Sequence, residues 1–303
     1  MDVLIKKPNV FCKHLKKELR LSSKNNTQYI ATVMKNRFLL LLSLTFFFQT
    51  LIAQPNCDNR CLDFDGINDY IQSNSALTGN AAMTIEMWFR TESTSTGPCN
   101  NTSIANFRWL IGWDDNNLGI GDCNGNLRVI YEPPCPIGTH LCSSLAAYPI
   151  NDGQWHHVAF MKGGGGIRIL IDGVYYTNFS EMSYDLSGTI RIGSSGSGTS
   201  GRTWDGQIDE VRIWNYFRSD QEIAENFLCE QTGNEPGLVL YHSFNEGIPE
   251  GDNTTTGIAT TPDLSSSNID GVLNNFTLIG DTSNYICADY PFNINCSNNP
   301  TPC

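Results

Sequence analysis

The chain has few of the residues and patterns on which several common functional sites depend. Histidine occurs only five times among 303 residues, and no two cysteines have the Cys-x-x-Cys spacing. Zinc clusters are usually built from such residues at such spacing, so zinc is a poor explanation for the cysteines. The HExxH, Walker A and GxSxG patterns are also absent. This argues against the zinc proteases, P-loop nucleotidases and α/β-hydrolases that those patterns mark.

Basic residues are scarce over most of the chain. Residues 1–53 hold nine of the 19 Lys and Arg but only two of the 31 Asp and Glu. The rest of the chain therefore carries 10 basic and 29 acidic side chains, a net charge near −19. Such a surface repels phosphate backbones and anionic lipid, so nucleic-acid binding is not expected.

A long apolar run occurs once, near the start of the chain. Residues 34–37 form a short basic segment, residues 38–52 are strongly apolar, and Ala53 supplies a small residue. This order predicts a secretory signal peptide over residues 34–53. Because such a signal normally begins a chain, residues 1–33 are interpreted as a mistaken start or a basic leader. No other run approaches the ~18 apolar residues of a membrane span, so we expect the mature chain to be secreted or at the cell surface.

The ten cysteines that follow the signal peptide are predicted to form disulfides. An even number of cysteines behind a signal peptide indicates an oxidising compartment. The full pairing cannot be deduced from the sequence. Closeness along the chain favours Cys99 with Cys123 and Cys135 with Cys142, each pair closing a loop.

Short strands and turns alternate from Cys57 onward. Residues 83–90, MTIEMWFR, alternate with the period of a half-buried strand. Asp-Gly pairs occur five times, and Asp205-Gly206 is expected to form a tight turn before the last strand of the series. The other predicted strands are 60–64, 70–72, 108–113, 127–131, 154–161, 167–172, 174–177, 189–193 and 208–214. Frequent short strands predict an all-β fold, a two-sheet antiparallel β-sandwich.

One helix is predicted, after the last strand of that series. Ser219 is followed by Glu222 three residues on, which is a capping box. The composition then changes, because residues 248–267 are rich in Pro, Gly, Asn and Thr. We therefore interpret residues 57–229 as the sandwich domain, and 230–303 as a linker with part of a further module or a partly ordered tail.

Six segments, in this order, resemble the laminin-G-like jelly roll of the concanavalin-A-like lectin/glucanase fold. They are CLDFDGINDYI (61–71), TIEMWFRT (84–91), GQWHHVAFMK (153–162), IRILIDGVYYT (167–177), TIRIGSS (189–195) and GQIDEVRIWNYFRSDQEI (206–223). The resemblance covers about residues 60–228, and residues 238–279 resemble the opening of a further such module. It implies a jelly roll of two antiparallel sheets. It also implies a module that binds glycans or proteins without catalysis, often with a calcium ion.

A structural calcium ion is predicted from the acidic residues that this resemblance brings together. It places the FDGINDY turn, with Asp65 and Asp69, beside the final strand, with Asp209. Calcium prefers six to eight oxygen ligands, which carboxylates and carbonyls supply. The alternative is that Asp65 and Asp69 cap turns through their own backbone, and that the acids at 209 and 210 pair with an arginine such as Arg212.

Sugar-binding candidates are aromatic residues in predicted loops beside polar groups. A sugar packs its CH face on a ring while its hydroxyls form hydrogen bonds. The alternative for each ring is burial in the sandwich core. The candidates are Trp113, Asp114, Tyr131, Tyr148 and Trp204.

Hydrolysis of glycans is less favoured. The glucanases that the fold resembles carry Glu-x-Asp-x-x-Glu on one strand, and this spacing is absent. His156 and His157 are neighbours in a predicted strand, so their rings face opposite sides. The sequence therefore predicts a secreted, non-catalytic module that binds a glycan or glycoprotein surface, with structural calcium. The alternatives are a protein-contact or structural module of a larger surface protein and, less favoured, a glycoside hydrolase.

Overall fold

The chain divides into two units, Met1–Ala53 and Gln54–Cys303. The computed structural model describes parts of the second unit, namely residues 57–77, 82–94, 99, 106–113, 118–131, 148–163, 166–180, 188–195 and 202–291. The side chains of residues 131 and 177–180 are not described. The predicted leader and signal peptide fall outside these residues.

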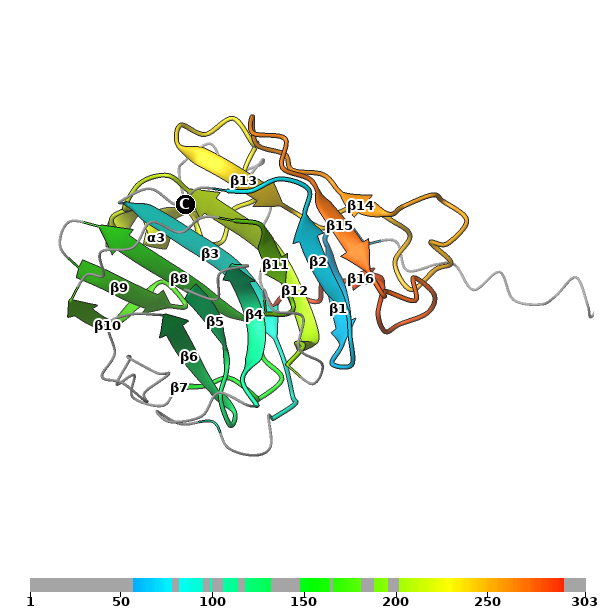
Figure 1. Ribbon diagram of the computed structural model, residues 1–303, viewed down its shortest axis with the longest axis horizontal. Coiled ribbons are helices and arrows are strands. Elements are labelled where there is room, and N and C mark those ends of the chain that lie inside the picture. The colour runs from blue at the N-terminus through cyan, green and yellow to red at the C-terminus, as the bar shows by residue number, and fades with distance from the viewer. Residues whose placement is uncertain are drawn as a thin grey trace, which may run out of the picture. The chain divides into compact units, whose positions relative to one another are not determined.

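Two antiparallel sheets of eight strands each form a sandwich from the described residues (Figure 1). In spatial order, sheet A contains β10 (Val174–Ser180), β9 (Gly166–Ile171), β8 (His156–Gly163), β3 (Met83–Arg90), β12 (Asp205–Trp214), β1 (Arg60–Asp65) and β16 (Tyr285–Cys287), and β13 (Leu238–His242) also pairs with β12. Sheet B contains β14 (Thr260–Thr261), β15 (Gly271–Asn274), β2 (Tyr70–Ser73), β11 (Ile190–Ile192), β4 (Arg108–Trp113), β5 (Leu118–Asp122), β6 (Asn126–Tyr131) and β7 (Tyr148–Pro149). The predicted β-sandwich is confirmed.

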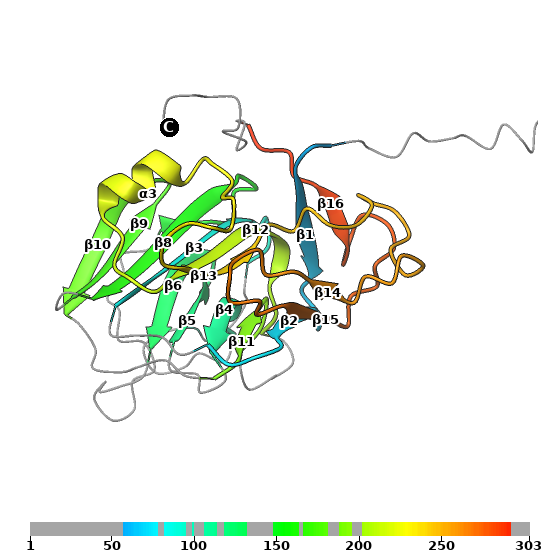
Figure 2. The same cartoon turned by 90° about the horizontal axis from the view of Figure 1, so that it is seen from above.

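The core lies between the sheets, where alternate side chains of each strand meet. On β3 these are Ile85, Met87 and Phe89, which are fully buried among the core residues. The predicted helix is also confirmed. It is α3 (Asp220–Asn226), and Ser219 and Glu222 complete the capping box at its start. Figure 2 shows α3 on the face of sheet A that points away from sheet B, where Ile223 packs against β8 and β9, so the helix covers part of that face.

Strand β12 contains a bulge that changes which side chains face the core. Its register with β3 shifts between Asp209 and Arg212, and Glu210 has a φ of 53°. One extra residue in a strand bends it and offsets the alternation of its side chains. Ile208 and Val211 both remain in the core, so the two acids between them are accommodated without either entering it.

The predicted tight turn at Asp205-Gly206 is wrong, because these residues begin β12. They pair with Asp65 and Phe64 of β1. Glycine is still required at this place. Gly206 has a φ of 133°, and a Cβ there would lie 2.3 Å from the carbonyl oxygen of Arg90.

The chain beyond residue 230 contributes strands to both sheets. β13 pairs with β12, β16 with β1, and β15 with β2. The disulfide between Cys57 and Cys287 joins β16 to the start of the described residues. The sequence predicted a linker and part of a further module after residue 229. The structure instead places these later residues in the sandwich itself. Without β16 and β15, β1 and β2 would each have an unpaired edge.

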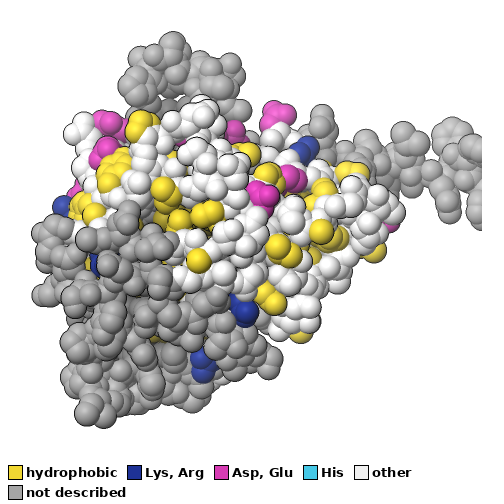
Figure 3. Space-filling view, turned by 45° about the horizontal axis from the view of Figure 1, so that its top comes forward, with side chains coloured by type: hydrophobic (Ala, Val, Ile, Leu, Met, Phe, Trp, Pro, Cys, Tyr) yellow, Lys and Arg dark blue, Asp and Glu magenta, His cyan; other side chains and the backbone are white. Residues whose placement is uncertain are grey.

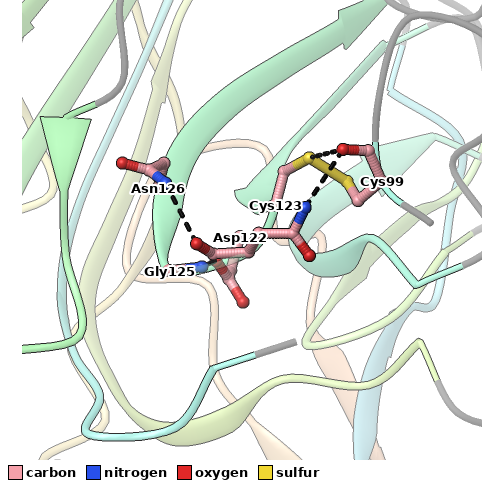
Figure 4. Close-up of a disulfide and its surroundings, with 6 residues drawn as sticks. Cys99, Asp122, Cys123, Gly125 and Asn126 are labelled. Carbon is pink, nitrogen blue, oxygen red and sulfur yellow. Dashed lines mark hydrogen bonds between the residues drawn. A yellow bond between two sulfur atoms is a disulfide. The ribbon is translucent and has the colours of Figure 1, made fainter. Parts of the chain in front are cut away.

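The predicted disulfide between Cys99 and Cys123 is confirmed (Figure 4). It packs with Phe107, Trp109 and Ile130 in a small cluster separate from the main core. Beside it, Asp122 Oδ1 accepts a hydrogen bond of 2.6 Å from the N–H of Gly125. The predicted partners Cys135 and Cys142 lie outside the described residues.

Cys61 departs from the prediction that the cysteines after the signal peptide pair. Its thiol is free and fully buried. Burial and the charge of Asp209 raise the pKa of this thiol, so it stays protonated and packs as a small apolar group. Separately, no helix within the described residues is long and apolar enough to cross a membrane.

Candidate functional site

The two tryptophans predicted as sugar-binding rings are buried in the sandwich core. Trp113 is 0% and Trp204 1% exposed. Trp204 packs edge-on against Phe89 with ring centroids 5.7 Å apart. Both predictions are wrong, because an aromatic residue near a strand end closes the core as readily as it faces solvent. Asp114 and the side chain of Tyr131 lie outside what the structure describes, which leaves one predicted ring, Tyr148.

Tyr148 lies where the edges of the two sheets meet. It is on β7, the edge strand of sheet B, and Tyr176 is on β10, the edge strand of sheet A. The two ring centroids are 5.3 Å apart with an interplanar angle of 85°. Both rings pack against the core but are only half-buried. The pair therefore presents aromatic surface at the rim of the sandwich.

Tyr176 lies at a second bulge, in β10. The register of β10 with β9 shifts between Tyr175 and Thr177, so Tyr176 is the extra residue. Tyr175 is 47% exposed, and the guanidinium of Arg168 lies 5.2 Å from its ring centroid. Tyr176 instead contacts Tyr148. The two neighbouring tyrosines therefore face opposite sides of sheet A, as alternation along a strand predicts.

His156 connects the ring pair to two carboxylates. Its Nδ1 lies 3.0 Å from Asp172 Oδ2, and its Nε2 lies 3.2 Å from Asp152 Oδ1. Tyr148 donates its hydroxyl hydrogen to the same Asp172 oxygen at 3.2 Å. The other Asp172 oxygen accepts the backbone N–H of His157 at 2.8 Å. We call Tyr148, Asp152, His156, Asp172 and Tyr176 the rim cluster.

The charges of the rim cluster follow from these contacts. Burial alone would lower the pKa of His156, but the hydrogen bonds and charges of Asp172 and Asp152 outweigh it and raise that pKa. Burial would raise the pKa of both carboxyls, and their hydrogen bonds lower it instead. Burial and the charge of Asp172 raise the pKa of Tyr148 to about 12. Near neutral pH the carboxylates are therefore ionised and the phenol is a donor.

The rim cluster differs in exposure from one member to the next. The side chain of His156 is 10% exposed, that of Asp172 37% and that of Asp152 53%. Asp152 Oδ1 accepts from His156 and from the N–H of Gln154. Its other oxygen is in no hydrogen bond among the described residues, so it is the acceptor that this cluster offers to a ligand.

A larger cleft lies elsewhere, at the ends of β1 and β3 and the start of β12. Its volume is about 870 Å³. The single aromatic ring in its lining, Phe64, is 1% exposed. Arg90 and Asp289 in its wall form an ion pair of 2.6 Å. The carboxyl-bearing residues of the lining are Asp63, Asp65, Glu92, Asp205, Glu250 and Asp289. Without an exposed ring, this cleft suits a sugar less well than the rim cluster.

The predicted calcium ligands do not converge. Asp65 pairs with Asp205, four residues before Asp209 on β12, which separates the two by roughly 13 Å along the strand. Asp209 Oδ2 instead accepts the hydroxyl of Tyr290 at 2.7 Å. Among the described residues, no group of three His, Cys, Asp or Glu side chains could hold a metal. The prediction of one calcium site from Asp65, Asp69 and Asp209 is therefore wrong.

Turn capping accounts for the first two of these acids. Asp65 Oδ1 accepts the N–H groups of Ile67 at 2.8 Å and Asn68 at 3.3 Å. Asp69 Oδ2 accepts the N–H of Asp65 at 3.0 Å. The alternative reading of the FDGINDY turn is thus confirmed. One polar atom remains unpaired, since Asp69 Oδ1 is buried with no hydrogen-bond partner among the described residues. A single such oxygen is not a calcium site.

A second group of charges is buried on the outer face of sheet A. Arg218 pairs with Glu86, and His157 Nε2 lies 3.5 Å from the other Glu86 oxygen. Arg212 pairs with Glu210, which also accepts the hydroxyl of Tyr241 at 2.8 Å. Burial would raise the pKa of Glu86, but the His157 hydrogen bond and Arg218 lower it to about 2. These carboxylates are at most 1% exposed, so a substrate does not reach them.

Sequence comparison places the fold in a known family. Residues 65–224, more than half of the chain, match the Laminin_G_3 family, described as concanavalin A-like lectin/glucanases superfamily. The chain belongs to this superfamily. The predicted resemblance to laminin-G-like jelly rolls is therefore confirmed.

Two individual proteins show how far the similarity extends. A crystal structure from Bacteroides ovatus, presented as a candidate carbohydrate-binding protein, superposes with a TM-score of 0.55 at 20% identity. The match covers 80% of this chain and 63% of that one. The rat protein "Sushi, von Willebrand factor type A, EGF and pentraxin domain-containing protein 1" is 26% identical over 211 residues. The match covers 64% of this chain but only 5% of the rat protein.

Sequence reasoning missed most of the rim cluster. It found Tyr148, and it correctly set His156 and His157 on opposite faces of their strand. A signal for Tyr176 was present, because two consecutive tyrosines, Tyr175 and Tyr176, come one residue after the Asp172-Gly173 turn. In an alternating strand, one member of such a pair must face inward.

Proposed function

We propose that this chain is a non-catalytic module that binds carbohydrate at the rim cluster. The observation that supports this most is the half-buried Tyr148–Tyr176 pair next to the free oxygen of Asp152. A sugar needs a ring for its CH face and acceptors for its hydroxyls, and these groups supply both. Membership of a superfamily that includes lectins supports the same conclusion, as does the role assigned to the Bacteroides ovatus structure.

The engagement of Asp172 supports binding over hydrolysis. Its two oxygens already accept hydrogen bonds from Tyr148, His156 and the backbone of His157. A glycosidase requires two carboxyl groups that are available on either side of the scissile bond. At the rim cluster only Asp152 has an available oxygen, so a sugar is held there without being cleaved.

The proposed setting is extracellular. Two disulfides among the described residues, Cys57–Cys287 and Cys99–Cys123, suit an oxidising compartment. Secretion through the predicted signal peptide over residues 34–53 would deliver the chain there. We assign no calcium ion to Asp65, Asp69 and Asp209.

The experiment is a glycan array followed by titration calorimetry with the best-bound oligosaccharide. Tyr176→Ala removes one ring of the pair and is expected to weaken binding by roughly tenfold. Tyr175→Ala is the matched control, because it removes the neighbouring exposed tyrosine of the same strand from the opposite face. Equal losses from the two variants, or a wild type that binds no glycan, would refute the proposal.

A further inference from the structure

We infer that the rim cluster selects neutral sugars and excludes sugars that carry a carboxylate or sulfate. This inference rests on the proposed function and adds the chemical class of the ligand. It follows from what the cluster exposes to solvent, which is hydrogen-bond acceptors with negative charge beside the ring pair.

The exposed charge of the cluster is anionic. Asp152 and Asp172 have side chains 53% and 37% exposed, and hydrogen bonds lower the pKa of both carboxyls. Both remain ionised at neutral pH. A sugar hydroxyl donates to such an oxygen, whereas a carboxylate or sulfate has no hydrogen to donate and is repelled.

The cations near the cluster do not change this. His156 is the cation closest to the carboxylates, but its side chain is only 10% exposed and both ring nitrogens face Asp152 and Asp172. Its N–H groups are therefore not available to an anionic sugar. Among the described residues, Arg128 of β6 is a second cation near the cluster, and its charge lowers the pKa of Tyr176.

The phenol of Tyr148 is a second donor of the cluster that is already committed. The phenol of Tyr148 keeps its proton, with a pKa of about 12, and donates it to Asp172. An anionic group placed on the rings would thus meet carboxylate oxygens with no free donor from His156 or Tyr148. A neutral sugar in the same place would donate its hydroxyls to Asp152.

The test compares matched pairs of glycans that differ only in an acidic group, such as lactosamine oligosaccharides with and without sialic acid or sulfate. The wild type is expected to bind each acidic member at least ~10-fold more weakly than its neutral partner. Asp152→Asn keeps an oxygen acceptor but removes the charge. It is expected to reduce the ratio of neutral to acidic affinity. The control, Asp58→Asn, removes the same charge from an exposed residue next to Cys57, whose disulfide lies at the sheet edge opposite β10.

The outcomes separate this inference from the proposed function. Acidic glycans that bind as tightly as their neutral partners would overturn the inference and leave the proposed function standing. The inference would also be overturned if Asp152→Asn left the ratio of neutral to acidic affinity unchanged, or if Asp58→Asn changed that ratio equally. No binding of either member of any pair would overturn both. Unfolding midpoints of the two variants that match the wild type show that any change belongs to the binding site.

Discussion

Replacing Arg212 with methionine tests whether the buried charges on sheet A hold the outer layer in place. The guanidinium is 1% exposed, pairs with Glu210, and donates to the carbonyl oxygen of Cys229 at 2.6 Å. The substitution keeps most of the side-chain volume but leaves Glu210 buried with the hydroxyl of Tyr241 as its remaining side-chain donor. We expect the free energy of unfolding to fall by about 3–5 kcal/mol, the usual cost of breaking a buried pair.

The design separates the ion pair from loss of packing. Glu210→Gln is expected to cost a similar amount, because it leaves the buried guanidinium of Arg212 without its carboxylate partner. The Arg212→Met, Glu210→Gln double variant should cost at least ~2 kcal/mol less than the sum of the single variants, because no unpaired charge remains. Arg168→Met is the control. Its pair with Asp220 is more than one-third exposed on both sides and should contribute ~1 kcal/mol or less.

Urea unfolding with intact disulfides, followed by tryptophan fluorescence, measures all four variants. In Arg212→Met the pKa of Glu210, which burial already raises, should rise further. A raised carboxyl pKa favours the folded state at low pH, so the deficit of this variant should be smaller at pH 5 than at pH 8. Single-variant losses that add within ~0.5 kcal/mol would show that Arg212 and Glu210 are not coupled, and the reasoning would fail.

Three further perturbations have definite expected outcomes. Burial raises the pKa of Asp63 to about 6, so the stability that its protonated form contributes is lost as pH rises from about 4 to 6. The urea midpoint of Asp63→Asn should therefore change less with pH over that range than the wild-type midpoint. Asp209→Asn should lower the melting temperature equally in calcium and in chelator, because the partner of Asp209 is Tyr290; a difference between the two conditions would restore a calcium role. Ser219→Ala removes the cap of α3 and should cost ~1 kcal/mol in thermal unfolding, whereas no loss would mean that the cap is dispensable.

The strands that the sequence predicted are those whose signal is local. β3 alternates over its full length and was predicted at its observed bounds. β5 was missed because Gly119 and Gly121 weaken its strand character. The reason for glycine at 119 is not local, since a Cβ there would lie 1.8 Å from the ring of Trp109 on the neighbouring strand. The neighbouring strand explains why glycine is needed there, and the sequence does not show which strand is the neighbour.

The site was harder to predict than the fold for the same reason. Tyr148 and Tyr176 belong to edge strands of different sheets, so their contact depends on how the sandwich closes. Trp113 and Trp204 were predicted on the same grounds as Tyr148, as aromatic residues in expected loops. Both are core residues. Residue type and loop position indicate which rings are candidates. Burial, which decides among them, is set by distant strands.

The two bulges show how one inserted residue determines what each face of sheet A carries. Side chains alternate with a period of two, so an extra residue reverses the facing of every residue that follows it. On β12 the bulge keeps Val211 and Ile213 in the core after two consecutive acids. On β10 the bulge falls at Tyr176, which contacts Tyr148, while Tyr175 lies beside Arg168 on the other face of the sheet. The tyrosine of the ring pair is thus the one whose place in the alternation faces the core, and the bulge reverses the strand only from Thr177 on.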